Sequence, residues 1–420
     1  MRPPVIVCAL LLLGALGASS AEDYTLSRCL ELSREKSVDA VQAILDEQGA
    51  KAAAREAGSA RLPKLLFSGQ LLRSDNATTN LPDDNNATLA LEQRLLPYSS
   101  AWTRARQQGA LYKAAVLAKV ETQQDVDLAV KRLYFSILQS SDDIAGIQAV
   151  DVQFRRLLET VLPKYTIGHA PAFDPVKVRV ALADLARDRG ALEAQLSEQR
   201  QTLALVMGLP DGVALALTPL RAFPDPPADG FAASALAFNP TLKTQAKRIE
   251  AAQFGVRAAQ ALRYPDVVGH LDYNYAAQAT SLMTPGWTAS VALRMPIFDW
   301  GGISAQVRQE RVAVDKARAQ LEADRQSALS SLAGSLAQAK AHREDYRRYL
   351  DLVASVHEIA VAGVARYRRG ASSILEATDG VNLWLNTLAA ERAAYYGYLS
   401  DLAQLERLSG EEPYKPAYER

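Results

Sequence analysis

Two turns of this chain carry a glycine and, six residues later, a carboxylate. In the first turn Gly168 precedes Asp174. In the second turn Gly370 precedes Glu376, and Asp379 follows within one further helical turn. Glycine suits a chain reversal that needs a left-handed backbone conformation, and acids just after a reversal cap the next helix and favour its dipole. Where several copies surround a pore, the same carboxylates attract cations, so both uses stay open.

The other residue types that do chemistry form no recognisable site. Gly370-Ala371-Ser372-Ser373 has half of a nucleophile elbow, but it lacks the second glycine and follows a helix instead of a strand. The chain has no glycine-rich loop of the phosphate-binding kind. The histidines are scattered without ligand spacing, at His169, His270, His342 and His357. We therefore expect no enzyme, no metal site and no cofactor.

Composition restricts the partners and the compartment. The 420 residues carry 47 Lys and Arg against 47 Asp and Glu. A neutral chain has no field to displace phosphate counterions, so we expect no nucleic-acid partner. Residues 1–21 are predicted to be a secretory signal peptide, because Arg2 precedes a short apolar run and Ser19-Ser20-Ala21 offers a cleavage site. No later run reaches the roughly 18 apolar residues that a membrane-spanning helix needs.

The chain repeats itself with an offset of 202 residues. Arg61-Leu62-Pro63 recurs as Arg263-Tyr264-Pro265, and the turn at 164–168 recurs at 366–370. One constant offset over most of the chain indicates a tandem duplication. After the signal peptide we expect a first repeat at 22–220, a proline-rich linker at 221–230, a second repeat at 231–410 and a C-terminal tail at 411–420.

Each repeat is predicted to contain a helix, two strands, a very long helix, a turn and another long helix. Proline-free helical stretches at 102–162 and 303–365 would each extend for roughly 90 Å, at about 1.5 Å per residue. Apolar residues on the helix after each turn follow the 4-3 spacing of long helices that pack against one another. The predicted fold class is therefore mainly α with β.

The predicted strands alternate between apolar and polar residues. Apolar side chains such as Leu271 and Val291 occupy one face of each strand, and polar side chains occupy the other. Strands of about ten residues with this alternation are typical of outer-membrane β-barrels, although a half-buried sheet in a soluble α+β domain has the same pattern. Four strands cannot close a barrel, so a chain that inserts them in a membrane must oligomerise. In such a barrel the lumen residues would be Glu92, Arg94, His270, Asp272, Asn274 and Arg294.

Several motifs resemble those of the TolC-like outer-membrane efflux proteins. They are the duplicated architecture, the helix opening Asn239-Pro240, the segment Leu-Arg-Met-Pro-Ile-Phe-Asp-Trp-Gly-Gly at 293–302, and the turn at 366–370. The first repeat departs from the pattern, since Arg94 stands in the place of Pro296 and Ser99-Ser100 in that of the glycine pair. The resemblance implies a homotrimer in which each chain contributes two β-hairpins to a twelve-stranded outer-membrane β-barrel. It also implies that the long helical hairpins form a periplasmic α-barrel of twelve helices.

The resemblance assigns roles at the two turns, which in this family form the periplasmic tip where the pore narrows. Tyr367 matches the gate-locking aromatic, and Asp174, Glu376 and Asp379 match the acidic positions inside the mouth. For Asp174, helix capping is as well supported as gating, whereas a pore role is favoured for Glu376 with Asp379. Ser372 stands where some relatives carry a basic lock residue, so their closed-state salt bridge lacks its cation here. Adaptor docking is expected at Tyr165, Gly168, Gly370, Ser372 and Ser373.

The function implied by the resemblance is that of a passive exit duct for small molecules in a tripartite efflux system. Its partners would be a periplasmic adaptor protein, an inner-membrane transporter and outer-membrane lipid, and its location the bacterial outer membrane with a long periplasmic extension. The exit duct of a type I protein-secretion system has the same architecture and is an alternative. A soluble periplasmic coiled-coil scaffold is the third hypothesis, and it would not fractionate with the outer membrane.

Overall fold

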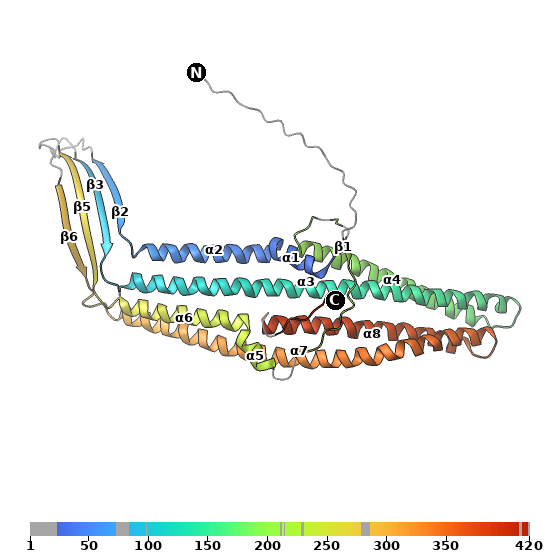
Figure 1. Cartoon of the computed structure of the whole chain (residues 1–420). Helices are drawn as coiled ribbons and strands as arrows, with labels where there is room; N and C mark the ends of the chain where they lie inside the picture. The colour runs from blue at the N-terminus through green and yellow to red at the C-terminus, as the bar shows by residue number, and fades with distance from the viewer. Residues whose placement is uncertain are drawn as a thin grey trace, which may run out of the picture.

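The structure, a computed structural model, describes residues 23–72, 84–97, 99–210, 212–213, 215–227, 231–278, 286–410 and 414–418. The predicted signal peptide at 1–21 lies outside these residues. Figure 1 shows an elongated layer of helices with a four-stranded sheet rising from one end. Within the described residues, no helix contains a stretch apolar and long enough to cross a bilayer.

The elements recur in the order that the duplication predicts. They are β1 (Asp23–Tyr24), α1 (Leu26–Lys36), α2 (Val38–Ser59), β2 (Lys64–Leu72), β3 (Asp84–Arg94), α3 (Ser100–Thr166), α4 (Phe173–Val206), β4 (Ala216–Leu217), α5 (Phe231–Phe238), α6 (Pro240–Ala261), β5 (Asp266–Gln278), β6 (Gly286–Arg294), α7 (Gly302–Arg368) and α8 (Ile374–Ser409). The two longest helices, α3 and α7, each contain 67 residues and begin at positions related by the repeat offset. α3 continues through Pro163 to Thr166, although this proline has no N–H to donate to the carbonyl of Glu159.

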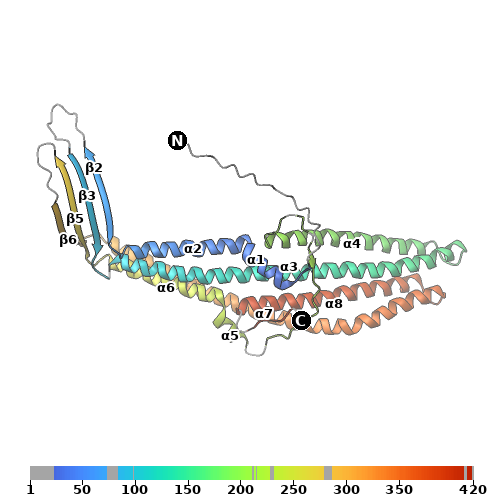
Figure 2. The ribbon, with the colours of Figure 1, turned by 45° about the horizontal axis from the view of Figure 1, so that its top comes forward.

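The long helices pack side by side, and two of them run the whole length of the layer. In the half next to the sheet the order is α2-α3-α6-α7. In the other half α3 packs against α4 and α8, and α8 packs against α7, as Figures 1 and 2 both show. The predicted 4-3 seam of α4 is buried at Val178, Leu185, Leu196 and Leu203. α3 therefore contacts both repeats and holds them in one layer.

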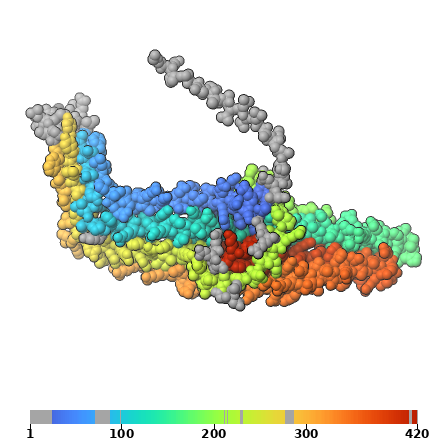
Figure 3. Space-filling model, in the orientation of Figure 1, coloured from blue at the N-terminus to red at the C-terminus, as the bar shows by residue number. Residues whose placement is uncertain are grey.

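The sheet has the strand order β2-β3-β5-β6, and all neighbouring strands are antiparallel. One register row joins Phe67, Leu89, Tyr273 and Trp287. Because directly paired residues share a face, all odd-numbered residues of the four strands lie on one face and all even-numbered residues on the other. Figure 3 shows the sheet projecting beyond the helices. The large apolar residues of the odd-numbered face are exposed, Phe67 and Trp287 by 76% and 73%.

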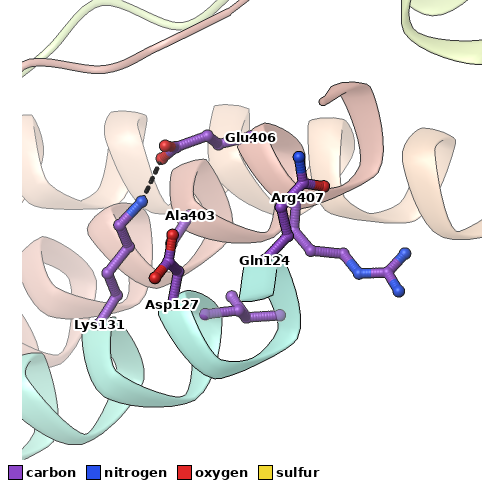
Figure 4. A pocket seen from close by; sticks show the side chains of 7 residues that line it. Gln124, Asp127, Lys131, Ala403, Glu406 and Arg407 are labelled. Carbon is purple, nitrogen blue, oxygen red and sulfur yellow. Dashed lines mark hydrogen bonds and ion pairs between the residues drawn. The ribbon is translucent and has the colours of Figure 1, made fainter. Parts of the chain in front are cut away.

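A network of charged side chains lies in the middle of the helical layer, where α3 meets α8. Figure 4 shows Asp127 and Lys131 of α3 facing Glu406 and Arg407 of α8. Lys131 donates a hydrogen bond from Nζ to Glu406 Oε2 at 2.6 Å, and both side chains are almost fully buried. Arg34 of α1 forms an ion pair with Asp127. These pairs connect the N-terminal helix and the two repeats.

Removing one charge from the buried pair should cost more stability than removing both. Lys131→Met leaves Glu406 buried and unpaired, so we expect it to lower the free energy of unfolding by about 3–5 kcal/mol. Lys131→Met combined with Glu406→Leu should recover most of that loss. Urea unfolding followed by the circular dichroism of the helices measures both effects.

The matched control is the exposed pair between Arg28 and Glu31, whose nitrogen and oxygen are 3.2 Å apart. Arg28→Met should change the free energy of unfolding by at most about 1 kcal/mol, since exposed ion pairs are screened by water. If Arg28→Met and Lys131→Met lowered the free energy of unfolding equally, the buried pair would contribute no more to stability than an exposed pair.

Candidate functional site at the helical tip

The two turns at the far end of the helical layer have the same backbone construction. Gly168 and Gly370 both adopt a φ of 77°, the left-handed conformation that the glycines predict. The amide after each glycine donates to the carbonyl five residues earlier, from His169 to Lys164 at 2.8 Å and from Ala371 to Arg366 at 2.9 Å. This Schellman arrangement satisfies carbonyls at the helix ends and aims the next helix back along the layer.

Three side chains, Lys164, Asp174 and Tyr367, which we call the clasp, make polar contacts between the two hairpins at the tip, beside a buried apolar cluster that both hairpins share. The Tyr367 hydroxyl donates to Asp174 Oδ2 at 2.6 Å, and both residues are buried. Lys164 Nζ donates to the main-chain oxygen of Tyr367 at 2.6 Å and lies 4.8 Å from the centroid of its ring. A charge-assisted hydrogen bond and a cation–π contact thus connect the α3–α4 hairpin to the α7–α8 hairpin.

The clasp also sets the protonation of its tyrosine. Burial, followed by the hydrogen bond to Asp174 and the charge of that carboxylate, raises the pKa of Tyr367 well above its usual value. Because the folded-state pKa is raised, the stabilisation is fully present below the pKa of an unfolded tyrosine, about 10. It is lost only as the pH rises through the higher folded-state pKa.

The three predicted mouth acids lie in different settings. Asp174 does not cap α4, whose N-cap is Ala172 and has no side-chain hydrogen bond; its carboxylate instead accepts from the other hairpin. Glu376 lies in the first turn of α8, and its N–H donates to the N-cap Ser373 Oγ at 3.2 Å. Asp379 lies beyond that first turn. The helix-dipole interpretation therefore applies to Glu376 and not to Asp379.

Glu376 and Asp379 nevertheless line one open groove between α7 and α8. Close approach of the two helices forms its floor, because a Cβ atom at Gly363 or Gly380 would lie 3.6 Å from a Cα atom of the facing helix. Ser372 Oγ donates to the Gly363 oxygen at 3.4 Å, so it bonds within its own hairpin. The charged groups of the groove are Glu358, Arg366, Glu376 and Asp379.

The outer surface of the tip is apolar on the first hairpin and positively charged on the second, a difference that the sequence analysis did not predict. Tyr165 is 47% exposed, and Ile167 and Phe173 beside it are exposed apolar residues of the first hairpin. The second hairpin instead exposes Arg368 and Arg369 next to its glycine. Gly168, Gly370 and Ser373 lie on this same end of the molecule. The sequence analysis also did not predict a contact between Lys164 and the second hairpin, although the repeat aligns Lys164 with Arg366, next to Tyr367.

The six polar strand residues share one face of the sheet. His270 pairs across with Glu92, and Asp266 with Arg294, so Glu92, Arg94, His270, Asp272, Asn274 and Arg294 all belong to the even-numbered set. Thr88 donates to Asn274 Oδ1 at 2.8 Å on this face. Arg94 lies 3.8 Å from Asp266 at the end nearest the helices. Among the described residues, no cluster of three His, Cys, Asp or Glu could hold a metal ion.

Comparison with known proteins identifies the fold. Residues 232–411 match the family model described as "Outer membrane efflux protein". The outer-membrane channel OprN matches with a TM-score of 0.83 and 18% identity over 92% of this chain and 90% of that one. VceC from Vibrio cholerae matches with a TM-score of 0.80 and 17% identity over 92% and 96% of the two chains. The open state of MtrE from Neisseria gonorrhoeae gives 0.77 and 16% over 91% and 88%.

No curated protein sequence matches the chain significantly. The structural matches define the class, which is the mainly α fold of TolC-like outer-membrane channels, with long helical hairpins and pairs of strands. The second repeat of the chain is similar to the outer membrane efflux protein family, whose model it matches. The resemblance and the fold class predicted from the sequence are thereby confirmed.

Loss of the clasp should let the two hairpins separate at the tip. Spin labels at Ile167→Cys and Arg369→Cys report the distance between the turns, and Cys29 is fully buried and so protected from labelling. Tyr367→Phe removes the hydrogen bond to a charged group, worth about 1.5–3 kcal/mol, and should lengthen or broaden the distance distribution. Lys164→Met should act in the same direction.

The repeat supplies the control for this experiment. Tyr165 occupies in the first turn the place that Tyr367 occupies in the second, but it is exposed, so Tyr165→Phe should leave the distribution unchanged. In the unmodified clasp the distribution should hold up to about pH 10 and broaden only above it, because the pKa of Tyr367 is raised. A Tyr367→Phe protein with a native distribution would show that the hydrogen bond does not hold the hairpins.

Proposed function

We propose that this protein is the outer-membrane exit duct of a tripartite efflux system, assembled as a homotrimer and conducting small molecules passively. The observation that carries the proposal is that one chain forms an open layer with unpartnered edges on matching sides. The sheet order β2-β3-β5-β6 and the helix order α2-α3-α6-α7 place the first repeat at one edge and the second repeat at the other.

Such edges favour a ring of identical chains. β2 and β6 each leave one side of the strand without a partner within the described sheet. In the edge helix α2, Val38, Val41 and Leu45 are exposed at the 3-4 spacing of a packing stripe. A head-to-tail contact of β6 and α7 with β2 and α2 of the next copy would close the ring. Three copies supply the twelve strands that the family resemblance implies.

The two faces of the sheet support a membrane location. The odd-numbered face exposes Leu65, Leu271 and Val291, and the even-numbered face carries charges and amides. A bilayer around the apolar face and a water-filled lumen on the polar face would satisfy both. The soluble scaffold offers no such partner for the apolar face, whereas the type I secretion alternative shares this architecture.

The tip supports the periplasmic end of the duct. The clasp would hold the two hairpins of each chain together and keep the mouth narrow, and its release would widen the mouth. The exposed surface around Tyr165, Gly168, Gly370, Ser372 and Ser373 is available to a periplasmic adaptor, through which the duct would connect to an inner-membrane transporter. Lys164 supplies within one chain the positive charge that Ser372 does not.

Charge placed on the two sheet faces tests the membrane location. Val291→Arg puts a cation on the proposed lipid face and should reduce insertion, at a cost of roughly 2–4 kcal/mol near the bilayer midplane. Ser290→Arg, one residue away on the other face, should insert normally and change conductance. The measurements are the yield of trimer in the outer-membrane fraction and single-channel recordings in planar bilayers.

Two results would contradict the proposal. Equal yields for Val291→Arg and Ser290→Arg would show that neither face meets lipid. A chain that is monomeric and soluble without detergent would support the scaffold instead.

The mouth acids can be separated by their different positions in α8. In a ring, Glu376→Gln and Asp379→Asn should each lower cation selectivity in planar-bilayer recordings, because each removes carboxylates from the narrow end. Only Glu376→Gln should also lower the free energy of unfolding, by about 0.3–1 kcal/mol, since only Glu376 lies in the first turn.

Arg368→Gln is the opposite control, because it removes a cation of the same hairpin and should raise cation selectivity. Unchanged selectivity in both acid variants would leave the interaction with the helix dipole as the sole role of Glu376 and would show that Asp379 has no role in the pore.

A further inference from the structure

The seam between α3 and α8 contains two separate apolar clusters with a polar break between them. One cluster fills the middle of the layer, and its buried members extend along α3 to Leu138 and along α8 to Tyr395. The other is the cluster that the hairpins share at the tip, and its buried members start at Ile147 on α3 and end at Trp384 on α8. Between these levels the two helices contact each other through charged side chains. Apolar packing therefore joins α3 to α8 on both sides of the break, and polar groups join them within it.

Four charged residues occupy the break, and we call them the joint: Asp142 and Asp143 of α3, and Glu391 and Arg392 of α8. Arg392 Nη1 donates to Asp143 Oδ1 at 3.4 Å, and only 17% and 18% of the two side chains are exposed. The buried Tyr396 donates from its hydroxyl to Asp142 Oδ2 at 2.6 Å. Glu391 lies close enough to Arg392 and to both aspartates to interact with their charges. Three carboxylates thus share one guanidinium, which leaves an excess of negative charge.

Gly146 of α3 makes room for the arginine of the joint. A Cβ atom at this position would lie 2.3 Å from Arg392 Nη1, so any other residue would push the guanidinium away. The guanidinium therefore lies directly against the backbone of α3, within reach of Asp143. Glycine weakens the interior of a helix, and this close approach accounts for a glycine in the interior of the 67-residue α3.

The neighbouring helices add mainly uncharged groups at this level. Tyr346 of α7 and Tyr395 of α8 interact with the joint, and their ring centroids are 5.2 Å apart. Burial raises the pKa of both tyrosines, that of Tyr395 to about 12, so both are neutral at physiological pH. α4 contacts α3 here through the amide of Gln199, which bonds to two serine hydroxyls. On the α7 side the next titratable contact lies one level nearer the sheet, where His342 Nδ1 is 2.8 Å from Asp401 Oδ2.

Burial makes the ionisation of two acids of the joint unfavourable. It raises the pKa of Asp143 and of Glu391 above the ordinary carboxyl values of about 4, and it outweighs the attraction of Arg392, which lowers them. Because the pKa is raised in the packed state, the packed seam holds these protons more tightly than an open seam would. The stabilisation by protonation is fully present below about pH 4, and it is lost as the pH rises through the raised values.

We infer that the break in the α3–α8 seam is a proton-sensitive joint, at which α8 packs against α3 more firmly in mild acid than at neutral pH. Excess negative charge between two helices favours their separation, whereas the apolar clusters hold them together above and below the break. Protons then act as a ligand that binds the packed state better than the open one. All these groups belong to one chain, so the joint operates whether or not copies form a ring. In the proposed duct it would stiffen the helical layer when the periplasm is acidified.

Hydrogen exchange of the main-chain amides, measured by mass spectrometry on the full chain in detergent, tests this inference. Peptides that cover residues 139–146 of α3 and 386–393 of α8 report local opening of the joint. After correction for the intrinsic effect of pH on exchange, their protection should be roughly fivefold higher at about pH 5 than at about pH 7.5, the low end of coupling between a ligand and a conformation. Asp143→Asn combined with Glu391→Gln mimics the protonated acids and should give the higher protection at both pH values.

Two variants are matched controls for this experiment. Asp151→Asn removes a carboxylate of α3 that pairs with the exposed Arg155, and His342→Gln removes the titratable contact with Asp401. Both variants should keep the native response to pH. If either control abolishes the response, or if the double variant of the joint keeps it, the acids of the joint are not its cause.

Arg392→Gln checks the sign independently. It removes the one cation of the joint, so protection of the same two peptides should fall at about pH 7.5 and recover at about pH 5. If the double variant fails to fold, Glu391→Gln alone should raise protection at about pH 7.5. Native protection that is equal at both pH values, or an Arg392→Gln protein with native protection, would overturn the proton-sensitive joint.

Discussion

The pairing of main-chain hydrogen-bonding groups at the edges of the sheet is the constraint on which the rest of the molecule depends. β2 and β6 leave a row of N–H and C=O groups on their outer sides, and in lipid each unsatisfied group costs several kcal/mol. One chain cannot close four strands on themselves. The helices share the problem, because α2 and α7 flank the layer on the same two sides. In the proposed duct, a single chain is therefore a segment of a ring.

The two repeats meet through different interactions at different levels of the layer. Next to the sheet, α3 and α6 pack through small residues, and Ala251, Ala258 and Ala259 of α6 are buried. In the middle, ion pairs such as Lys131 with Glu406 join α3 to α8. At the tip the two hairpins share a buried apolar cluster, and the clasp of Lys164, Asp174 and Tyr367 adds hydrogen bonds between them. Polar contacts of this kind have defined geometries, which suits the proposed separation of the hairpins at the tip.

Duplication has produced two copies with different surroundings. Tyr165 and Tyr367 occupy the same place in identical turns, yet one is half exposed and the other is buried against Asp174. The turns after β3 and β6 diverge as well, since Ser99-Ser100 in the first repeat stands where Gly301-Gly302 follow the exposed Trp300 in the second. Identical backbone construction thus supports a clasp in one place and an exposed surface in another.

Local chemistry allowed much of this architecture to be predicted from the sequence. The period of two in the strands assigned residues such as His270 and Leu271 to opposite faces, and the register agrees, because side-chain alternation is a property of each strand alone. The repeat offset and the two glycines located the long helices and their turns for the same reason. The TolC-like family followed from motifs that are contiguous in the chain.

Tertiary structure alone decided which residues of the tip meet. Asp174 and Tyr367 are 193 residues apart, and their contact depends on how two 67-residue helices pack over their full length. A small rotation about either axis, accumulated over that length, would carry the tyrosine past the carboxylate. The contact of Lys164 with the Tyr367 ring and the burial of Lys131 against Glu406 also depend on how the long helices pack. Periodicity determines which face a side chain occupies, whereas only the packed layer determines which side chain of the other repeat it meets.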